Sequence, residues 1–280
     1  MEQSAKSRTL NILRKFNLRA NKKLGQNFLI SDSVLDGIVE AAQIQADDIV
    51  IEIGPGIGTL TEKLVQSNCR QVIAVELDRR MKPVLDELEK KYDNLKVVYE
   101  DILKLNLADL LGEQQFKVVA NLPYYITTPI IMYFLESDFC YERLLVMVQN
   151  EVAQRMVSPP GSKVYGALSI AVQYRTYAQI AFTVTPEAFI PPPGVDSAVI
   201  LCRRRQQPAV QVKDEKLFFN IVKAAFSQRR KVIFNSLKNI GTTGEQTQNW
   251  LSVAGIDEKR RAETLSLEEF AKLEETYNKW

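Results

Sequence analysis

Short apolar runs alternate along most of the chain with segments whose apolar residues recur every three or four positions. The runs have the length of buried strands, and the periodic segments predict amphipathic helices. We predict strands at residues 49–53, 71–78, 95–102, 116–120, 143–149, 178–184 and 198–202, and helices at 9–16, 31–39, 59–65, 81–92, 128–136 and 151–156. This alternation predicts an α/β fold with a doubly wound sheet, whose last two strands close as an antiparallel pair.

The pattern changes near residue 205. A linker beginning with three arginines is followed by helical patterning only, in segments 216–226, 230–238, 246–254 and 266–277. We therefore expect three parts: a basic N-terminal arm over 1–30, a catalytic domain over 31–205 and a small all-helical domain over 206–280. With 280 residues, 46% of them hydrophobic, the chain is long enough for one large and one small core.

Three glycines, Gly54, Gly56 and Gly58, separate the first predicted strand from the helix that follows it. A glycine lets the backbone approach a ligand without a clashing Cβ, and a helix start offers free N–H groups. The spacing is G-x-G-x-G after Glu52, whereas the dinucleotide fingerprint is G-x-G-x-x-G. The turn predicts a nucleotide site, and an ordinary strand boundary is the alternative.

Acidic residues end the next two predicted strands. Glu76 and Asp78 lie roughly 20 residues past the glycine turn, where an acid can reach the ribose hydroxyls of an adenosine ligand. Asp101 ends the third strand in the same way. Because these strand ends open onto one crevice, we expect the acids to lie together, although each alone fits a helix cap.

The fourth strand runs into Asn121-Leu122-Pro123-Tyr124. This turn resembles the N-[LIP]-P-[YF] motif of methyltransferases that act on exocyclic amino nitrogens. Such a nitrogen, for example N6 of adenine, is a poor nucleophile because its lone pair is delocalised, and it has to be held by acceptors. The Asn121 side-chain oxygen can accept one N–H, and Pro123 fixes an extended Leu122 whose carbonyl can accept the other. Tyr124 offers a face for a base. A simple turn after a strand is the alternative.

These motifs resemble the ribosomal RNA adenine N6,N6-dimethyltransferase family, in particular its bacterial small-subunit branch. The resemblance is carried in order by segments 22–29, 52–58, 76–78, 101, 121–124, 189–197 and 226–231. It implies a Rossmann-like class I methyltransferase sheet of seven strands that uses S-adenosylmethionine (SAM). The substrate would be two adjacent adenosines near the 3′ end of 16S rRNA in the small ribosomal subunit, modified during ribosome biogenesis.

The resemblance also implies roles for individual residues. The cofactor would be bound by Asn27, Leu29, Gly54, Glu76, Asp101 and Asn121. Catalysis would involve Asn121, Leu122, Pro123 and Tyr124, with Phe189 against the flipped adenine opposite Tyr124. Phe189 as an ordinary core residue is the alternative.

Charge and composition narrow the function further. Residues 1–30 hold seven Lys/Arg against one acid, and residues 203–238 hold ten against two. These segments suggest phosphate contacts with RNA through Lys22, Lys23, Arg229, Arg230 and Lys231, with an ordinary solvated surface as the alternative. The chain has no histidine and three scattered cysteines, so we expect no metal site. It shows neither a membrane span nor a signal peptide, which predicts a cytoplasmic protein, and a monomer is the default expectation.

Three other functions compete with this interpretation. A large-subunit rRNA methyltransferase of the macrolide-resistance type would share the motifs, but Tyr125 and the prolines at 191–193 argue against it. A non-catalytic ribosome-assembly or transcription factor on the same fold could lose Asn121 or Glu76, which are both present here. An NAD dehydrogenase is disfavoured by the glycine spacing.

Overall fold

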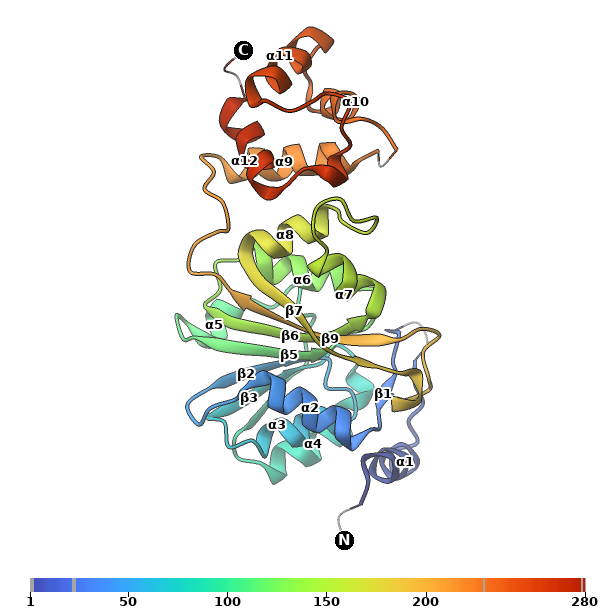
Figure 1. The fold of residues 1–280 in the computed structure, drawn as a ribbon. Coiled ribbons are helices and arrows are strands. Elements are labelled where there is room, and N and C mark those ends of the chain that lie inside the picture. Colours follow the sequence, from blue (N-terminus) through green and yellow to red (C-terminus); the bar gives the residue numbers. More distant parts are fainter. Residues whose placement is uncertain (1–2, 22–23, 229, 278, 280) are drawn as a thin grey trace. The chain divides into compact units, whose positions relative to one another are not determined.

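The computed structural model describes residues 3–21, 24–228, 230–277 and 279. The chain forms two compact units, shown as a ribbon in Figure 1. The first contains residues 1–153 and 179–204, and the second contains residues 154–178 and 205–280. Residues 154–178, which we expected within a catalytic domain ending at 205, therefore belong to the second unit. Tyr174 accounts for this assignment, since its ring stacks on Phe218 with the centroids 5.1 Å apart.

A seven-stranded sheet forms the centre of the first unit, in the order β4-β3-β2-β5-β6-β9-β7. The strands are β2 (Ile49–Ile53), β3 (Gln71–Val75), β4 (Leu95–Val98), β5 (Phe116–Asn121), β6 (Tyr141–Gln149), β7 (Thr176–Val184) and β9 (Ser197–Arg204). The five strands β2 to β6 pair in parallel, and β9 runs antiparallel to β6. The predicted Rossmann-like sheet with an antiparallel end is confirmed.

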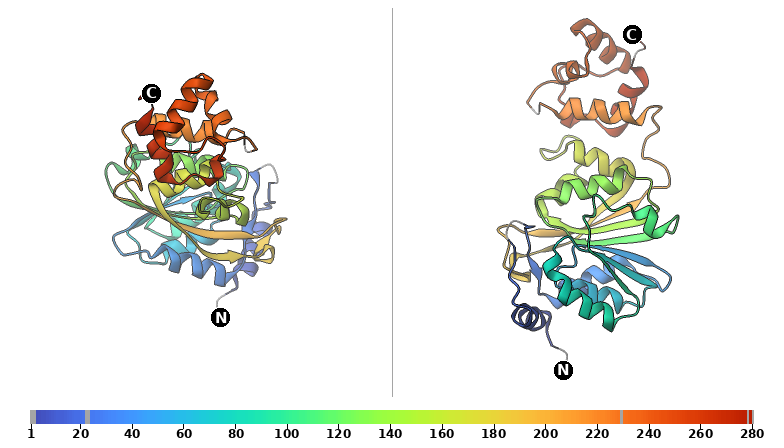
Figure 2. Two further views of the ribbon diagram at one scale, coloured as in Figure 1. Left: turned by 45° about the horizontal axis from the view of Figure 1, so that its top comes forward. Right: turned by 180° about the vertical axis from the view of Figure 1, so that it is seen from behind.

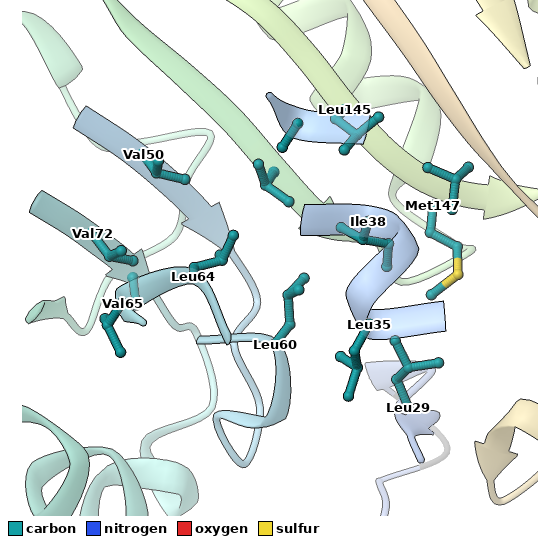
Figure 3. Packing of buried hydrophobic residues seen from close by; sticks show 14 of the residues in the cluster. Leu29, Leu35, Ile38, Val50, Leu60, Leu64, Val65, Val72, Leu145 and Met147 are labelled. Carbon is teal, nitrogen blue, oxygen red and sulfur yellow. The ribbon is translucent and has the colours of Figure 1, made fainter. Parts of the chain in front are cut away.

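Helices cover both faces of this sheet. Figures 1 and 2 show α2 (Asp32–Ala42), α3 (Thr59–Val65) and α4 (Lys82–Lys91) on one face and α6 (Thr127–Glu136) on the other. The core beneath α2 and α3 is formed by aliphatic side chains, of which Leu35 and Leu64 face strand residues such as Val50 and Met147 (Figure 3). The remaining helices that begin in this unit are α1 (Ala5–Lys15), α5 (Leu107–Leu111) and α7 (Asn150–Val157).

The N-terminal arm is tied down by a second, two-stranded sheet. Strand β1 (Phe28–Leu29) pairs antiparallel with β8 (Phe189–Ile190), so that Leu29 lies opposite Phe189. The backbone N–H of Ile30 extends this pairing by donating to the carbonyl of Ala188 at 2.8 Å. Short 3₁₀ turns at Arg79–Met81 and Pro186–Ala188 follow β3 and precede β8. The arm is thereby fixed to the segment that leads into the last strand.

The second unit is a bundle of short helices. Its elements are α8 (Ala167–Arg175), α9 (Glu215–Phe226), α10 (Ile233–Leu237), α11 (Gly244–Ala254) and α12 (Leu267–Thr276), with 3₁₀ turns at Lys238–Ile240 and Ala262–Thr264. Trp250 is central to its core, and its indole N–H donates to the Leu273 carbonyl at 2.9 Å. The helical C-terminal region matches the prediction. Across the ranges given above, no helix is long and apolar enough to cross a bilayer.

Candidate active site

A cavity of about 1090 Å³, including its part open to solvent, lies at the carboxyl ends of β2 to β5. This is where doubly wound sheets bind ligands. It is lined by the glycine turn, the residues that end β3, β4 and β5, and residues 24–29 of the arm. The structure brings nine of the predicted site residues together in this lining: Asn27, Leu29, Gly54, Glu76, Asp101, Asn121, Leu122, Pro123 and Tyr124.

The glycine turn leaves room for a ligand and brings two helices close together. Gly54 has φ +70°, and a Cβ there would meet no atom within 4 Å, so the backbone is open to the cavity. Gly58 has φ +81°, and a Cβ there would overlap the side chain of Leu88 in α4. The first position therefore serves ligand approach and the second serves packing.

Glu76 presents a carboxylate to the cavity while both its oxygens are held by the backbone. One oxygen accepts from the N–H of Gly56 at 2.9 Å and the other from the N–H of Asp78 at 2.7 Å. Only 5% of the residue is exposed, and burial raises the pKa of its carboxyl. A carboxylate oxygen has lone pairs beyond these two bonds. Glu76 therefore fits the ribose diol of a nucleoside cofactor.

Asp101 lies at the end of β4 on the same cavity wall. Its Oδ1 accepts from the N–H of Leu103 at 3.1 Å, which orders the turn after the strand. The second carboxylate oxygen has no hydrogen bond within the described residues. Asp101 can therefore accept a hydrogen bond from a ligand in the cavity.

Glu52 also lines this cavity. It precedes the glycine turn in the sequence, which predicted no role for it. It is 2% exposed, and its Oε2 has no hydrogen-bond partner among the residues that the structure describes. Burial, together with the nearby charge of Glu76, raises the pKa of Glu52 to about 8. A buried polar atom without a partner beside a cavity is one that a ligand can satisfy, so the cavity fits a polar cofactor such as SAM.

The amide of Asn121 is oriented by the arm. Its Nδ2 donates to the main-chain carbonyl of Asn27 at 3.3 Å, which leaves its Oδ1 as an acceptor for a ligand. Asn27 in turn donates from its own side chain to the Gly25 carbonyl at 3.2 Å. In the described part of the chain, the carbonyl of Leu122 accepts no hydrogen bond. Two oxygens in the turn after β5 are thus available as acceptors.

Tyr124 is anchored through its hydroxyl. The hydroxyl oxygens of Tyr124 and Ser197 lie 2.6 Å apart, and Ser197 is fully buried at the start of β9. Burial raises the pKa of Tyr124, so the phenol stays protonated at neutral pH. The sequence motif contained Ser197 but gave no reason to assign it this contact, because the partners are far apart in sequence.

Gln26 was also missed by the sequence reasoning. Its Nε2 donates to Asp78 Oδ2 at 2.8 Å, and its Oε1 accepts from the N–H of Asn21 at 2.8 Å. Arg80 binds the same carboxylate, its Nε lying 2.9 Å from Oδ1, and this lowers the pKa of Asp78. Gln26 therefore fastens the arm to the segment after β3, next to Glu76. In the sequence, the only indication of such a role for Gln26 is its position in segment 22–29.

Three of the predicted residues, Phe189, Arg230 and Lys231, are not part of the cavity lining. Phe189 is 3% exposed, packs in the core opposite Leu29 and does not line the cavity. Its predicted place opposite Tyr124 remains a prediction. Arg230 and Lys231 are exposed in the second unit, whereas Lys22, Lys23 and Arg229 lie outside the described residues.

Comparison with known proteins places the chain in a family. The family model described as ribosomal RNA adenine dimethylase matches residues 17–279. A curated relative from Clostridium acetobutylicum, named ribosomal RNA small subunit methyltransferase A, is 47% identical over 266 residues, covering 95% of this chain and 96% of the relative. Among solved structures, a dimethyladenosine transferase from Plasmodium falciparum is 28% identical with a TM-score of 0.73, covering 90% of this chain and 98% of that one.

A second solved structure, the 23S rRNA methyltransferase ErmE, is 26% identical with a TM-score of 0.69, covering 89% of this chain and 99% of that one. The family model spans nearly the whole chain, and its match includes both the cavity and the helical unit. The chain therefore belongs to the ribosomal RNA adenine dimethylase family.

Proposed function

We propose that this protein transfers methyl groups from SAM to N6 of adenosines in small-subunit rRNA. The product is N6,N6-dimethyladenosine at two adjacent adenosines near the 3′ end of 16S rRNA, formed during ribosome biogenesis. The observation that carries the proposal is the turn after β5, where the Asn121 amide is held by Asn27 and its oxygen stays available beside the Leu122 carbonyl. The name of the 47% identical relative supports the choice of the small subunit.

The residues of the site form two groups, one that would bind SAM and one that would bind the target adenine. SAM supplies an electrophilic methyl group on a sulfonium. Glu76 would accept from the ribose hydroxyls and Asp101 from the adenine side of this cofactor, and Gly54 would allow close approach of the backbone. The arm residues Asn27 and Leu29 close the cavity from the other side.

The turn after β5 holds the base to be methylated. Tyr124, anchored to Ser197, provides a fixed ring on which the adenine stacks. In the first transfer, Asn121 Oδ1 and the Leu122 carbonyl would accept the two N6–H groups, which favours a pyramidal nitrogen with an available lone pair; in the second transfer one N6–H remains to be accepted. SAM would supply the methyl group, and Asn121 Oδ1 and the Leu122 carbonyl would bind the N6 amine more strongly as positive charge grows on it. The proton then leaves to water through the open side of the cavity.

Two alternative functions are a large-subunit rRNA methyltransferase and a non-catalytic protein on the same fold. Structural similarity does not separate small-subunit from large-subunit enzymes, because the TM-scores of 0.73 and 0.69 are close. The 47% sequence identity favours the small-subunit branch. A non-catalytic role does not require an acceptor kept free at Asn121 or a carboxylate held at Glu76, and both are present.

The substrate requires contacts beyond the cavity. We propose that rRNA phosphates around the uncharged target base are bound by Arg230 and Lys231. The same role is proposed for Lys22, Lys23 and Arg229, which lie outside the described residues. Phe189 is proposed to lie against the flipped adenine, opposite Tyr124. We further propose that the protein acts as a monomer on the small subunit in the cytoplasm.

Labelled methyl transfer to ribosomal subunits tests the proposal. Small and large subunits from cells without this modification are incubated with the protein and isotope-labelled SAM, with Asn121→Ala as the matched inactive variant. We expect label in small subunits with the wild type only. Label in large subunits, or equal label with both proteins, would contradict the proposed function.

A further inference from the structure

Tyr125 is an exposed aromatic residue on the rim of the candidate active site. It lines the cavity directly after Tyr124, and 54% of the residue is exposed. Most large apolar side chains in this unit are buried. The exposed ring of Tyr125 lies in the turn after β5, which also contains Asn121, so it offers a surface to a ligand.

The two adjacent tyrosines are held by different neighbours. The hydroxyl of Tyr124 binds Ser197 at the start of β9. The ring of Tyr125 instead lies against Gly25 of the arm, where a Cβ would come within 3.3 Å of its Cδ1. Gly25 has φ +57°, so a larger residue there would be both strained and crowded against the ring. The arm thus supports the edge of Tyr125 and leaves the rest of the ring exposed.

The chemistry of the substrate provides an occupant for this ring. A base that enters the active site leaves its own stack, and its neighbour then loses a stacking partner on that side. Aromatic side chains replace such partners in single-stranded RNA, because every base has a π face. In the proposed function the neighbour of each target is another adenosine, a purine with a large face.

We propose that Tyr125 stacks the base of the nucleotide next to the adenosine being methylated. This inference rests on the proposed function and adds a second base subsite to it. Tyr124 receives the target base, and Tyr125 receives its neighbour on the side of the arm. The subsite recognises an unpaired base through its face, without hydrogen bonds to its edge.

The test measures methyl transfer to small subunits reconstituted with 16S rRNA that carries either the normal nucleotide or an abasic nucleotide beside the target. On normal subunits, Tyr125→Ala should raise KM by about 5- to 150-fold, the range that base–aromatic stacking gives. Tyr125→Phe keeps the ring and should stay close to wild type. On abasic subunits the wild type should lose the same factor, and Tyr125→Ala should lose nothing further.

Two controls make the result specific. Tyr177→Ala removes a tyrosine that is 55% exposed and lies outside the cavity lining, and its KM should not change. SAM affinity, measured by calorimetry, should be the same in wild type and Tyr125→Ala. An unchanged KM in Tyr125→Ala, a loss confined to SAM affinity, or the same loss on abasic and normal subunits would each overturn the stacking role. A wild type that transfers no methyl group to any small subunit would overturn the proposed function itself.

Discussion

Replacing Asn121 by alanine separates the binding of the cofactor from the chemical step. Among the described residues the side chain makes one hydrogen bond, from Nδ2 to the Asn27 carbonyl at 3.3 Å, and its Oδ1 remains for the substrate. Losing a neutral hydrogen bond to the arm costs about 0.5–1.5 kcal/mol, which limits the loss of SAM affinity to roughly tenfold. Losing an acceptor that acts mainly in the transition state costs about 2.7–4 kcal/mol, or a rate 100- to 1000-fold lower.

The assay is single-turnover methyl transfer at saturating SAM and small subunits, with calorimetry for the affinity of SAM. Asn106→Ala serves as the matched control, because Asn106 caps α5 through its side chain and lies outside the cavity lining. Its rate should equal that of the wild type. If Asn121→Ala instead lost SAM binding and kept its single-turnover rate, Asn121 would be a cofactor ligand only, and the assignment of the target-base acceptor would be refuted.

Four further changes test the remaining parts of the site. Glu76→Ala should weaken SAM binding by roughly 10- to 150-fold in calorimetry, because the cofactor no longer donates a hydrogen bond to a charged acceptor. Burial raises the pKa of Glu52 from 4.5 to about 8, so its contribution to stability is full below about pH 4.5 and is lost as the pH rises through 8. Glu52→Gln should remove this loss. In denaturant unfolding, the free energy of unfolding of the variant should therefore rise relative to that of the wild type between pH 5 and 9. Ser197→Ala should lower kcat several-fold by freeing the stacking tyrosine, Ser197→Thr should restore it, and unchanged kcat would exclude a positioning role. Alanine at Arg230 and Lys231 should reduce the slope of log affinity against log salt by about 0.7–0.9 for each phosphate that the variant no longer binds, and an unchanged slope would identify ordinary surface charge.

Much of the fold was predictable because its signals are local. Strand β2 is buried at every position, and its apolar run is visible without any knowledge of its neighbours. The glycine turn and the acids at the ends of β3 and β4 were predictable for the same reason, since parallel strands place their carboxyl ends at one edge. The cavity lining confirms that Gly54, Glu76 and Asp101 lie together.

The contacts that were not predicted join segments distant in sequence. Ser197 meets Tyr124 across 73 positions, and Gln26 meets Asp78 across 52. Residues 154–178 pack with the helical unit because of the fit between Tyr174 and the rings of α9, which no periodicity reveals. Phe189 lies in the core, because pairing of β8 with β1 places it opposite Leu29. Its predicted role at the base remains a prediction.

Nucleoside analysis of the methylated rRNA tests the central claim most directly. Small subunits lacking the modification are treated with the wild type and SAM, and their 16S rRNA is digested and mapped by mass spectrometry. The proposed function predicts N6,N6-dimethyladenosine at two adjacent adenosines near the 3′ end. A product that stops at N6-methyladenosine, a methyl group on another base, or dimethyladenosine found only in large-subunit rRNA would contradict it.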